Sequence, residues 1–430
     1  MRCNRCSSRC SLGRIVASVL VSLTWASLSA AQPGGAPGAE ANQTVVLRTA
    51  RVLDGTGDVL ENRDIVVRAG SIAELLPAGR GRGDVVYDLT EVTVLPGYID
   101  THVHISRHFD AGGRLHPPEE VDDIGHLTLY GAENAYRTLM SGVTTVQSLG
   151  AAEDAELKAW IARGTIPGPR VLSSLGAVRS DTGTPAEIRA FVRDRAEAGA
   201  DVVKIFAATS IRFGGVTNLS AAQLEAACGE ARAQGLRSVV HLHRPDAVRL
   251  AADAGCTQIE HAWLVDRAAL ETIAESGMYL GNQIDLLFRN YAEHESGYVG
   301  IGGYSAEGFV NLQAARPGAR RVFEESLEVP GLKVVYSTDA VAGGHGRNAQ
   351  ELVAYVEIGG LRPMDVIISS TSLAAESLGL GDQIGTIAAG MAADVIALDG
   401  DPLIDAAALG RVVFVMRGGE VHKNSPPMVP

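Results

Sequence analysis

Cysteine is scarce in this chain, which has five among its 430 residues. Cys3, Cys6 and Cys10 lie close to the N-terminus, so only Cys228 and Cys256 remain in the body of the chain. Two cysteines do not make the disulfide framework by which small secreted domains compensate for a small core. They are compatible with one disulfide in an oxidising compartment, or with two small buried apolar side chains.

Positive charge is also in short supply, because 37 Lys and Arg face 50 Asp and Glu. Residues 1–31 contain four Arg and no acidic residue, so the rest of the chain has 37 − 4 = 33 basic residues and a net charge of 33 − 50 = −17. So acidic a surface argues against nucleic acid or an anionic membrane as a partner.

The apolar segment near the N-terminus, Ile15 to Leu28, is shorter than the ~20 residues that a membrane-spanning helix needs. Ser and Thr also interrupt it, which disfavours a membrane anchor. The small residues Ser29, Ala30 and Ala31 follow it. Basic residues precede it: Arg2, Arg5, Arg9 and Arg14. This three-part pattern predicts a signal peptide over residues 1–31, hence a periplasmic or secreted protein with no stable membrane partner after cleavage.

The remaining chain has the composition of a loop-rich globular protein, with 46% hydrophobic residues and 49 Gly. Residues 32–43 are rich in Gly and Pro and predict a flexible tether. Residues 44–93 and 385–424 consist of short runs of strand-forming residues separated by Gly and Asp turns. We expect these two segments to form one small β-sandwich built from both ends of the chain.

Residues 94–384 alternate short apolar runs with Ala/Glu/Arg-rich segments of helical character. Several of these segments end in Gly, as helices commonly do. The apolar runs are VTVLPGYIDTHVHI, VTTVQSLG, RVLSSLG, DVVKIFAA, SVVHLH, TQIEHA, MYLGNQ and KVVYSTDA. Eight such runs alternating with helices predict an α/β fold, a (β/α)₈ TIM-type barrel.

One stretch, from Ile284 to Phe309, is aromatic, Gly-rich and irregular in pattern. Because it follows the seventh predicted strand, we expect it to lie over the mouth of the barrel as a mobile lid or substrate wall. An inserted surface loop is the alternative interpretation. Its tyrosines, Tyr291, Tyr298 and Tyr304, are candidate walls of a substrate pocket.

Residues able to bind a metal end several of the predicted strands, where the active sites of such barrels lie. His102 and His104 are two residues apart, so on a strand both imidazoles point to the same face and can reach one metal ion. Later strands carry Lys204, His241, His243, His261 and Asp339. Each motif alone has a structural explanation, such as a helix-capping Asp or a salt-bridged Lys. Together they predict a metal site.

Five segments of the chain resemble the amidohydrolase superfamily, in particular its imidazolonepropionase-like, prolidase and ochratoxinase branch. The segments are PGYIDTHVH, VVKIF, HLHRPDAVRLAADAGCTQIEH, STDA and GTIAAGMAADVIALDGDPL. The resemblance extends from about Val45 to Lys423. It implies a hydrolase with two divalent metal ions, for which four imidazoles and oxygen ligands favour zinc.

The resemblance also implies a role for each ligand. His102 and His104 would bind the more buried metal ion together with Asp339. His241 and His261 would bind the second ion. Lys204, carboxylated by carbon dioxide, would bridge both. Asp339 would accept a proton from the metal-bound hydroxide that attacks the substrate and pass it to the departing amine.

Two residues outside the ligand set are candidates for binding the substrate. His243 would face the substrate, because the spacing from His241 to His261 is that of the superfamily and assigns His241 as the ligand. Arg347 follows Asp339 in sequence, and its guanidinium is suited to a substrate carboxylate, although a surface or structural role is the alternative.

The resemblance implies a small-molecule amide as the substrate, cleaved at its C–N bond, of the dipeptide or N-acyl amino acid type. The same metal pair could act on a lactone or an organophosphate ester. A non-catalytic binding protein on the same barrel is a third possibility, but no predicted ligand is missing. A homo-oligomer is compatible with the sequence.

Overall fold

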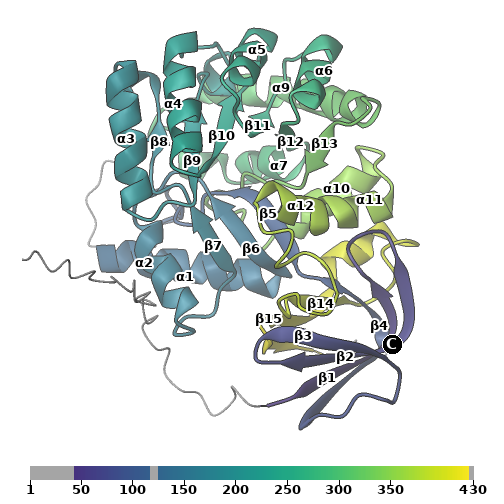
Figure 1. Ribbon diagram of the computed structural model, residues 1–430. Helices are drawn as coiled ribbons and strands as arrows, with labels where there is room; N and C mark the ends of the chain where they lie inside the picture. The colour runs from purple at the N-terminus through teal and green to yellow at the C-terminus, as the bar shows by residue number, and fades with distance from the viewer. Residues whose placement is uncertain (1–42, 117–123, 426–430) are drawn as a thin grey trace, which may run out of the picture. The chain divides into compact units, whose positions relative to one another are not determined.

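The computed structural model describes residues 43–116 and 124–425 (Figure 1). The predicted signal peptide and all of the tether except Gln43 lie outside this part of the chain. The fold is α/β, as the sequence predicts. Among the described residues, no helix has both the length and the apolarity needed to cross a membrane.

Strands from the two ends of the chain form one seven-stranded sheet, in the order β16-β15-β14-β4-β1-β2-β3. Figure 1 shows the purple N-terminal strands and the yellow C-terminal ones in this sheet. Strand β4 pairs in parallel with β1 and antiparallel with β14, and so joins the two ends. The apolar faces of these strands pack into one core, which includes Leu47, Val94, Ala397 and Phe414. The strands are β1 (Val45–Leu53), β2 (Val59–Arg68), β3 (Ser71–Pro77), β4 (Val85–Pro96), β14 (Val395–Leu398), β15 (Val412–Arg417) and β16 (Glu420–Asn424).

The middle of the chain forms two parallel sheets, and each of the eight predicted runs contains one of their strands. The first sheet is β5 (Tyr98–Val103), β6 (Val143–Ser148) and β7 (Arg170–Ser173). The second, in chain order, is β8 (Ala177–Val178), β9 (Val202–Phe206), β10 (Arg237–Leu242), β11 (Gln258–His261), β12 (Tyr279–Gly281) and β13 (Lys333–Val335). The two-residue strand β8 was not predicted. Beyond the end of β13, the amide of Asp339 donates to the carbonyl of His102, and that of His104 to Ala340, at 2.8 Å each.

Helices follow most of these strands, and their starts carry local signals in the sequence. Thr184 and Glu187 form a capping box at the start of α3, where Pro185 is the first helical residue. The helices are α1 (Ile124–Met140), α2 (Asp154–Ala162), α3 (Pro185–Glu197), α4 (Ala221–Ala233), α5 (Pro245–Asp253), α6 (Arg267–Glu275), α7 (Leu286–Glu293), α8 (Glu295–Tyr298), α9 (Ala306–Leu327), α10 (Ala349–Glu357), α11 (Pro363–Ser369) and α12 (Ser372–Ser377). The described residues also form the 3₁₀ turns η1 (Ser180–Thr182), η2 (Ile211–Phe213) and η3 (Ala406–Gly410).

The segment from 284 to 309 is more regular in structure than its irregular sequence pattern suggests. It contains α7, α8 and the start of α9. The buried carboxylate of Glu351 accepts hydrogen bonds from the backbone amides of Ile284 (2.5 Å) and Leu286 (2.6 Å) at the start of α7. These amides have no partner within the helix. The acceptor comes from α10, more than sixty residues later, so no local signal reveals this helix start.

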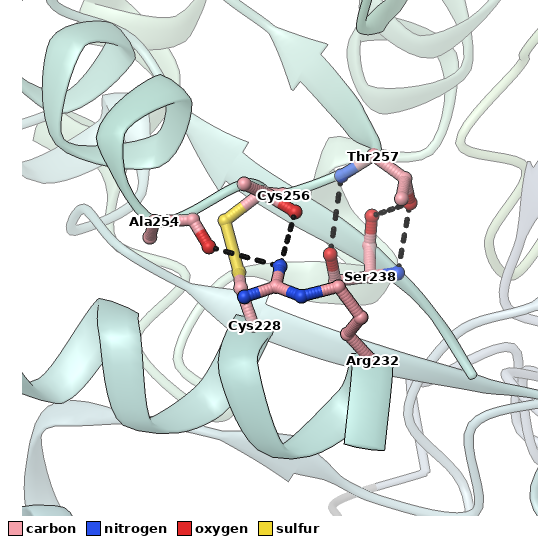
Figure 2. Close-up of a disulfide and its surroundings, with 7 residues drawn as sticks. Cys228, Arg232, Ser238, Ala254, Cys256 and Thr257 are labelled. Carbon is pink, nitrogen blue, oxygen red and sulfur yellow. Dashed lines mark hydrogen bonds between the residues drawn. A yellow bond between two sulfur atoms is a disulfide. The ribbon is translucent and has the colours of Figure 1, made fainter. Parts of the chain in front are cut away.

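Cys228 and Cys256 form a disulfide, which decides between the two interpretations of the sequence (Figure 2). It joins α4 to the segment that enters β11. Both side chains are also buried. Nearby, Ser238 and Thr257 exchange three hydrogen bonds, which link the starts of β10 and β11.

Candidate metal centre and its cavity

The parallel strands bring the predicted metal ligands to one place because carboxyl ends of parallel strands share an edge. His102 lies on β5, Lys204 on β9, His241 on β10 and His261 at the end of β11. His104 and Asp339 follow β5 and β13. All six line one cavity.

A first group of three ligands is close enough to hold a single cation. The candidate ligand atoms of His102, His104 and Asp339 all lie within 4.8 Å of one another. The Asp339 Oδ1 atom lies 3.0 Å from His104 Nε2 and 3.3 Å from His102 Nε2. Two neutral imidazoles and a carboxylate are a donor set that zinc and similar divalent ions prefer.

A second group lies beside the first. The ring centroids of His241 and His261 are 4.6 Å apart, and those of His102 and His261 are 5.4 Å apart. Lys204 contacts the first group, with its Nζ atom 3.3 Å from His102 Nε2, and its strand β9 pairs with β10, which carries His241. Among the described residues, no carboxylate forms an ion pair with Lys204, although its side chain is buried. A buried cation without an anionic partner is costly, so this amine calls for a further group.

Two of the candidate ligands occupy backbone conformations that are uncommon outside glycine. His261 has φ of 71° and Asp339 has φ of 50°, both in the left-handed region. Such conformations persist where surrounding contacts impose them, and they concentrate at functional sites. At Asp339 the contact is the hydrogen bond from its amide to the His102 carbonyl.

Burial sets the charge of the site. It lowers the pKa of His261 to about 4 and holds the pKa values of His102 and His241 well below their usual range. These imidazoles are therefore neutral near pH 7, the form that binds metal. Burial also lowers the pKa of Lys204 to about 8. Burial alone would raise the pKa of Asp339, but His102 and His104 outweigh it and lower the pKa, so the carboxylate is ionised.

The cavity has a volume of about 910 Å³ and combines cationic and aromatic walls. Arg107, Arg179 and Arg212 line it, together with Phe206 and Phe213. The guanidinium carbon of Arg179 lies 4.1 Å from the ring centroid of Phe206. The volume is within the roughly 300–1,000 Å³ of small-molecule sites.

The structure separates the substrate-binding candidates that the sequence suggested. Tyr291 and Tyr304 line the cavity, with their hydroxyl oxygens 3.0 Å apart. Tyr298 does not, because its hydroxyl donates to the buried carbonyl of Ala342 at 2.6 Å. His243 is buried beside His241 and Trp263 and is not among the lining residues.

The position of Arg347 corrects the expectation that its guanidinium faces the substrate. Arg347 does not line the cavity, and its Nη1 atom forms an ion pair with Glu293 at 2.7 Å. The cavity instead has Arg212, which the sequence analysis overlooked. The sequence offered one signal for Arg212: it lies in the loop after β9, the strand that carries Lys204, and such loops commonly carry functional residues.

Comparisons with known proteins agree with this geometry. Residues 93–423 match the model of the amidohydrolase family, so the chain belongs to that family. The resemblance inferred from the sequence is thereby confirmed. No curated protein sequence matches the chain.

Solved structures with a similar fold are numerous, and three illustrate the range. A Xaa-Pro dipeptidase with bound methionine in the active site is 26% identical, with a TM-score of 0.80, covering 89% of this chain and 100% of that one. A prolidase complexed with N-methylphosphonate-L-proline is 23% identical, with a TM-score of 0.79 and the same coverage. The ochratoxinase of A. niger is 22% identical, with a TM-score of 0.75, covering 90% of this chain and 98% of that one. With the family match, this places the chain among hydrolases that act on carbon–nitrogen bonds.

Proposed function

We propose that this protein is an exported, binuclear metal-dependent amidohydrolase that cleaves the amide bond of a small substrate bearing a carboxylate, such as a dipeptide or an N-acyl amino acid. One observation carries the proposal. Four imidazoles, one buried amine and one carboxylate from five strands meet in a single cavity. Export rests on the sequence pattern of residues 1–31.

The proposed architecture is a closed (β/α)₈ barrel over residues 94–384, with a β-sandwich formed by residues 44–93 and 385–424. Support for closure comes from the hydrogen bonds between β5 and the segment after β13, which join the outer strands of the two parallel sheets. Support for the second domain comes from the single sheet that contains strands of both chain ends.

The ligand assignment follows the two groups in the cavity. His102, His104 and Asp339 would hold one ion, His241 and His261 the other, and Lys204 would bridge them. For this the neutral Nζ of Lys204 would attack carbon dioxide, form an N–C bond and release one proton, which yields a carbamate whose single negative charge is shared by two oxygens. A carbamate would also give this buried side chain a charge that the two cations stabilise.

The reaction then depends on what each residue does around the substrate. Bound zinc ions would supply a water molecule of lowered pKa and polarise the scissile carbonyl. Asp339, an ionised acceptor at the cavity wall, takes the proton of the attacking water and delivers it to the departing nitrogen.

Arg212 is the proposed anchor for the substrate carboxylate. Its guanidinium stacks on Tyr304, and among the described residues its Nε atom has no hydrogen-bond partner. Arginine in such a position can bind a carboxylate through two parallel hydrogen bonds. Tyr291 and Tyr304 place two hydroxyl groups on the same wall.

The proposal is tested by measuring amine release from a panel of dipeptides and N-acyl amino acids with zinc-loaded protein. Asp339→Asn serves as the blank. Release that vanishes in this variant supports amide hydrolysis. Silence across the panel from protein that holds two metal ions, with turnover of lactones or phosphate esters, would replace the proposed substrate class. Silence on all of them would favour a binding protein.

A further inference from the structure

A buried carboxylate lies directly behind the candidate metal ligands. Glu260 precedes His261 on β11 and is fully buried. Its Oε2 atom accepts hydrogen bonds from His102 Nδ1 at 2.8 Å and from Gln283 Nε2 at 3.0 Å. Its Oε1 atom accepts from Gln258 Nε2 at 2.6 Å. Glu260 thus contacts one candidate ligand through its side chain and another through the peptide chain.

Gln283 extends the network to the second ligand group. Its Nε2 atom donates to Glu260 and also to Ser337 Oγ at 2.6 Å, so its Oε1 atom faces His261 Nδ1 at 2.7 Å. An amide oxygen only accepts, and therefore His261 Nδ1 carries the proton. His102 Nδ1 likewise donates to a carboxylate. Both rings consequently present an unprotonated Nε2 atom, the form needed to bind a metal ion.

The neighbouring strand leaves room for this carboxylate. Gly281 on β12 is the register partner of Glu260 on β11. A Cβ atom at Gly281 would lie 2.6 Å from Glu260 Oε2 and 2.6 Å from Ser337 Oγ, closer than real contacts allow. The φ of Gly281 is not in the left-handed region. The lack of space for a Cβ atom beside Glu260 therefore explains the glycine, and its backbone conformation does not.

We infer that Glu260 is a positioning residue that fixes the tautomers and ring orientations of His102 and His261. It acts on His102 directly and on His261 through Gln283. These two histidines are one ligand of each proposed metal ion. The inference rests on the proposed binuclear function. One carboxylate would thereby set the geometry of both ions together. The absence of a side chain at Gly281 leaves the space that the Glu260 carboxylate occupies.

Glu260→Gln is the variant that tests this network. The new amide group would point a donor at Gln258, Gln283 or His102, all of which are donors to Glu260. Asp64→Asn is the matched control. Asp64 is equally buried and accepts from Gly81 N and Arg48 Nε, but it lies in the seven-stranded sheet.

Zinc affinity and stoichiometry of the purified full-length protein are measured by competition with a chelator, alongside the melting temperature of the metal-free protein. We expect Glu260→Gln to weaken zinc binding by about 10- to 100-fold, the usual effect of losing a residue that orients metal ligands. Gly281→Ala should weaken it as well. Asp64→Asn should lower the melting temperature and leave zinc affinity unchanged.

Wild-type affinity in folded Glu260→Gln, or an equal loss in Asp64→Asn, would overturn the inference alone. Failure of the wild type to bind two ions would overturn the proposed function and the inference with it. Should Glu260→Gln not fold, the tautomers of His102 and His261 are read from ¹⁵N-histidine spectra of metal-free wild type. Protons on Nδ1 in both rings support the inference, and a proton on Nε2 in either ring contradicts it.

Discussion

The guanidinium carbon of Arg212 lies 3.8 Å from the ring centroid of Tyr304, although the two residues are more than ninety positions apart in the chain. Arg212 belongs to η2, in the loop after β9, and Tyr304 precedes α9. The stacking holds a planar cation against an aromatic wall of the cavity.

The first prediction is that Arg212→Ala raises KM for a dipeptide substrate by roughly 10- to 100-fold, because the substrate carboxylate loses a charge-assisted pair of hydrogen bonds. The same dipeptide with an amidated C-terminus should show no such change, because it offers no carboxylate. Arg347→Ala is the matched control, since Arg347 pairs with Glu293 and does not line the cavity. An equal effect on both substrates would refute a carboxylate anchor.

The second prediction concerns the metal ligands themselves. Lys204→Ala and Asp339→Asn should each reduce kcat by about a thousandfold or more, because Lys204→Ala removes the proposed bridge between the two ions and Asp339→Asn removes the proposed proton acceptor. Circular dichroism should show an unchanged fold. Near-normal turnover by either variant would rule out the two-ion mechanism.

Most of the parallel strands could be predicted because their signals are local. Each apolar run is short, bounded by turn residues, and followed by a helix pattern. Since parallel strands end at one edge, predicting the strands also predicted that His102, Lys204 and Asp339 would meet. The two-residue strand β8 is too short to leave such a pattern.

The rest of the site depends on contacts between distant segments. Arg347 lies close to Asp339 in sequence, but its guanidinium forms an ion pair with Glu293, and Arg347 does not line the cavity. Glu260 was detectable in principle, because a carboxylate within a buried strand is as unusual as the ammonium of Lys204. Its hydrogen bonds to His102 and Gln283 could not be predicted from the sequence, because they join β5, β11 and the loop after β12.

A third prediction follows from the disulfide between Cys228 and Cys256, which are 28 residues apart in the chain. Loss of a cross-link over a loop of this length lowers the free energy of unfolding by roughly 3–4 kcal/mol. Urea unfolding of wild type and of the Cys228→Ala/Cys256→Ala double variant should show this difference under oxidising conditions. With a strong reductant in the urea series, the two proteins should become similar. A difference that persists in the reductant would assign the loss to packing, not to the cross-link.

A fourth prediction concerns the pH dependence of stability and rests on Asp154, at the start of α2. Its buried carboxyl accepts hydrogen bonds from the hydroxyls of Ser106 and Ser173, and burial raises its pKa to about 6. The folded state therefore holds this proton more tightly than the unfolded state, in which the pKa is about 3.9. The resulting stability is fully present below pH 4 and is lost as the pH rises through 6.

In Asp154→Asn this contribution is absent, while both hydroxyls keep a partner because a hydroxyl can donate or accept. The free energy of unfolding of wild type relative to the variant should therefore fall by roughly 2 kcal/mol between pH 4 and pH 7. Urea unfolding of both metal-free proteins at four pH values measures this difference, and groups common to both proteins cancel. A difference that does not change with pH would mean that burial leaves the pKa of Asp154 at its ordinary value. A difference that grows with pH would mean that the hydroxyl donors outweigh burial and lower it.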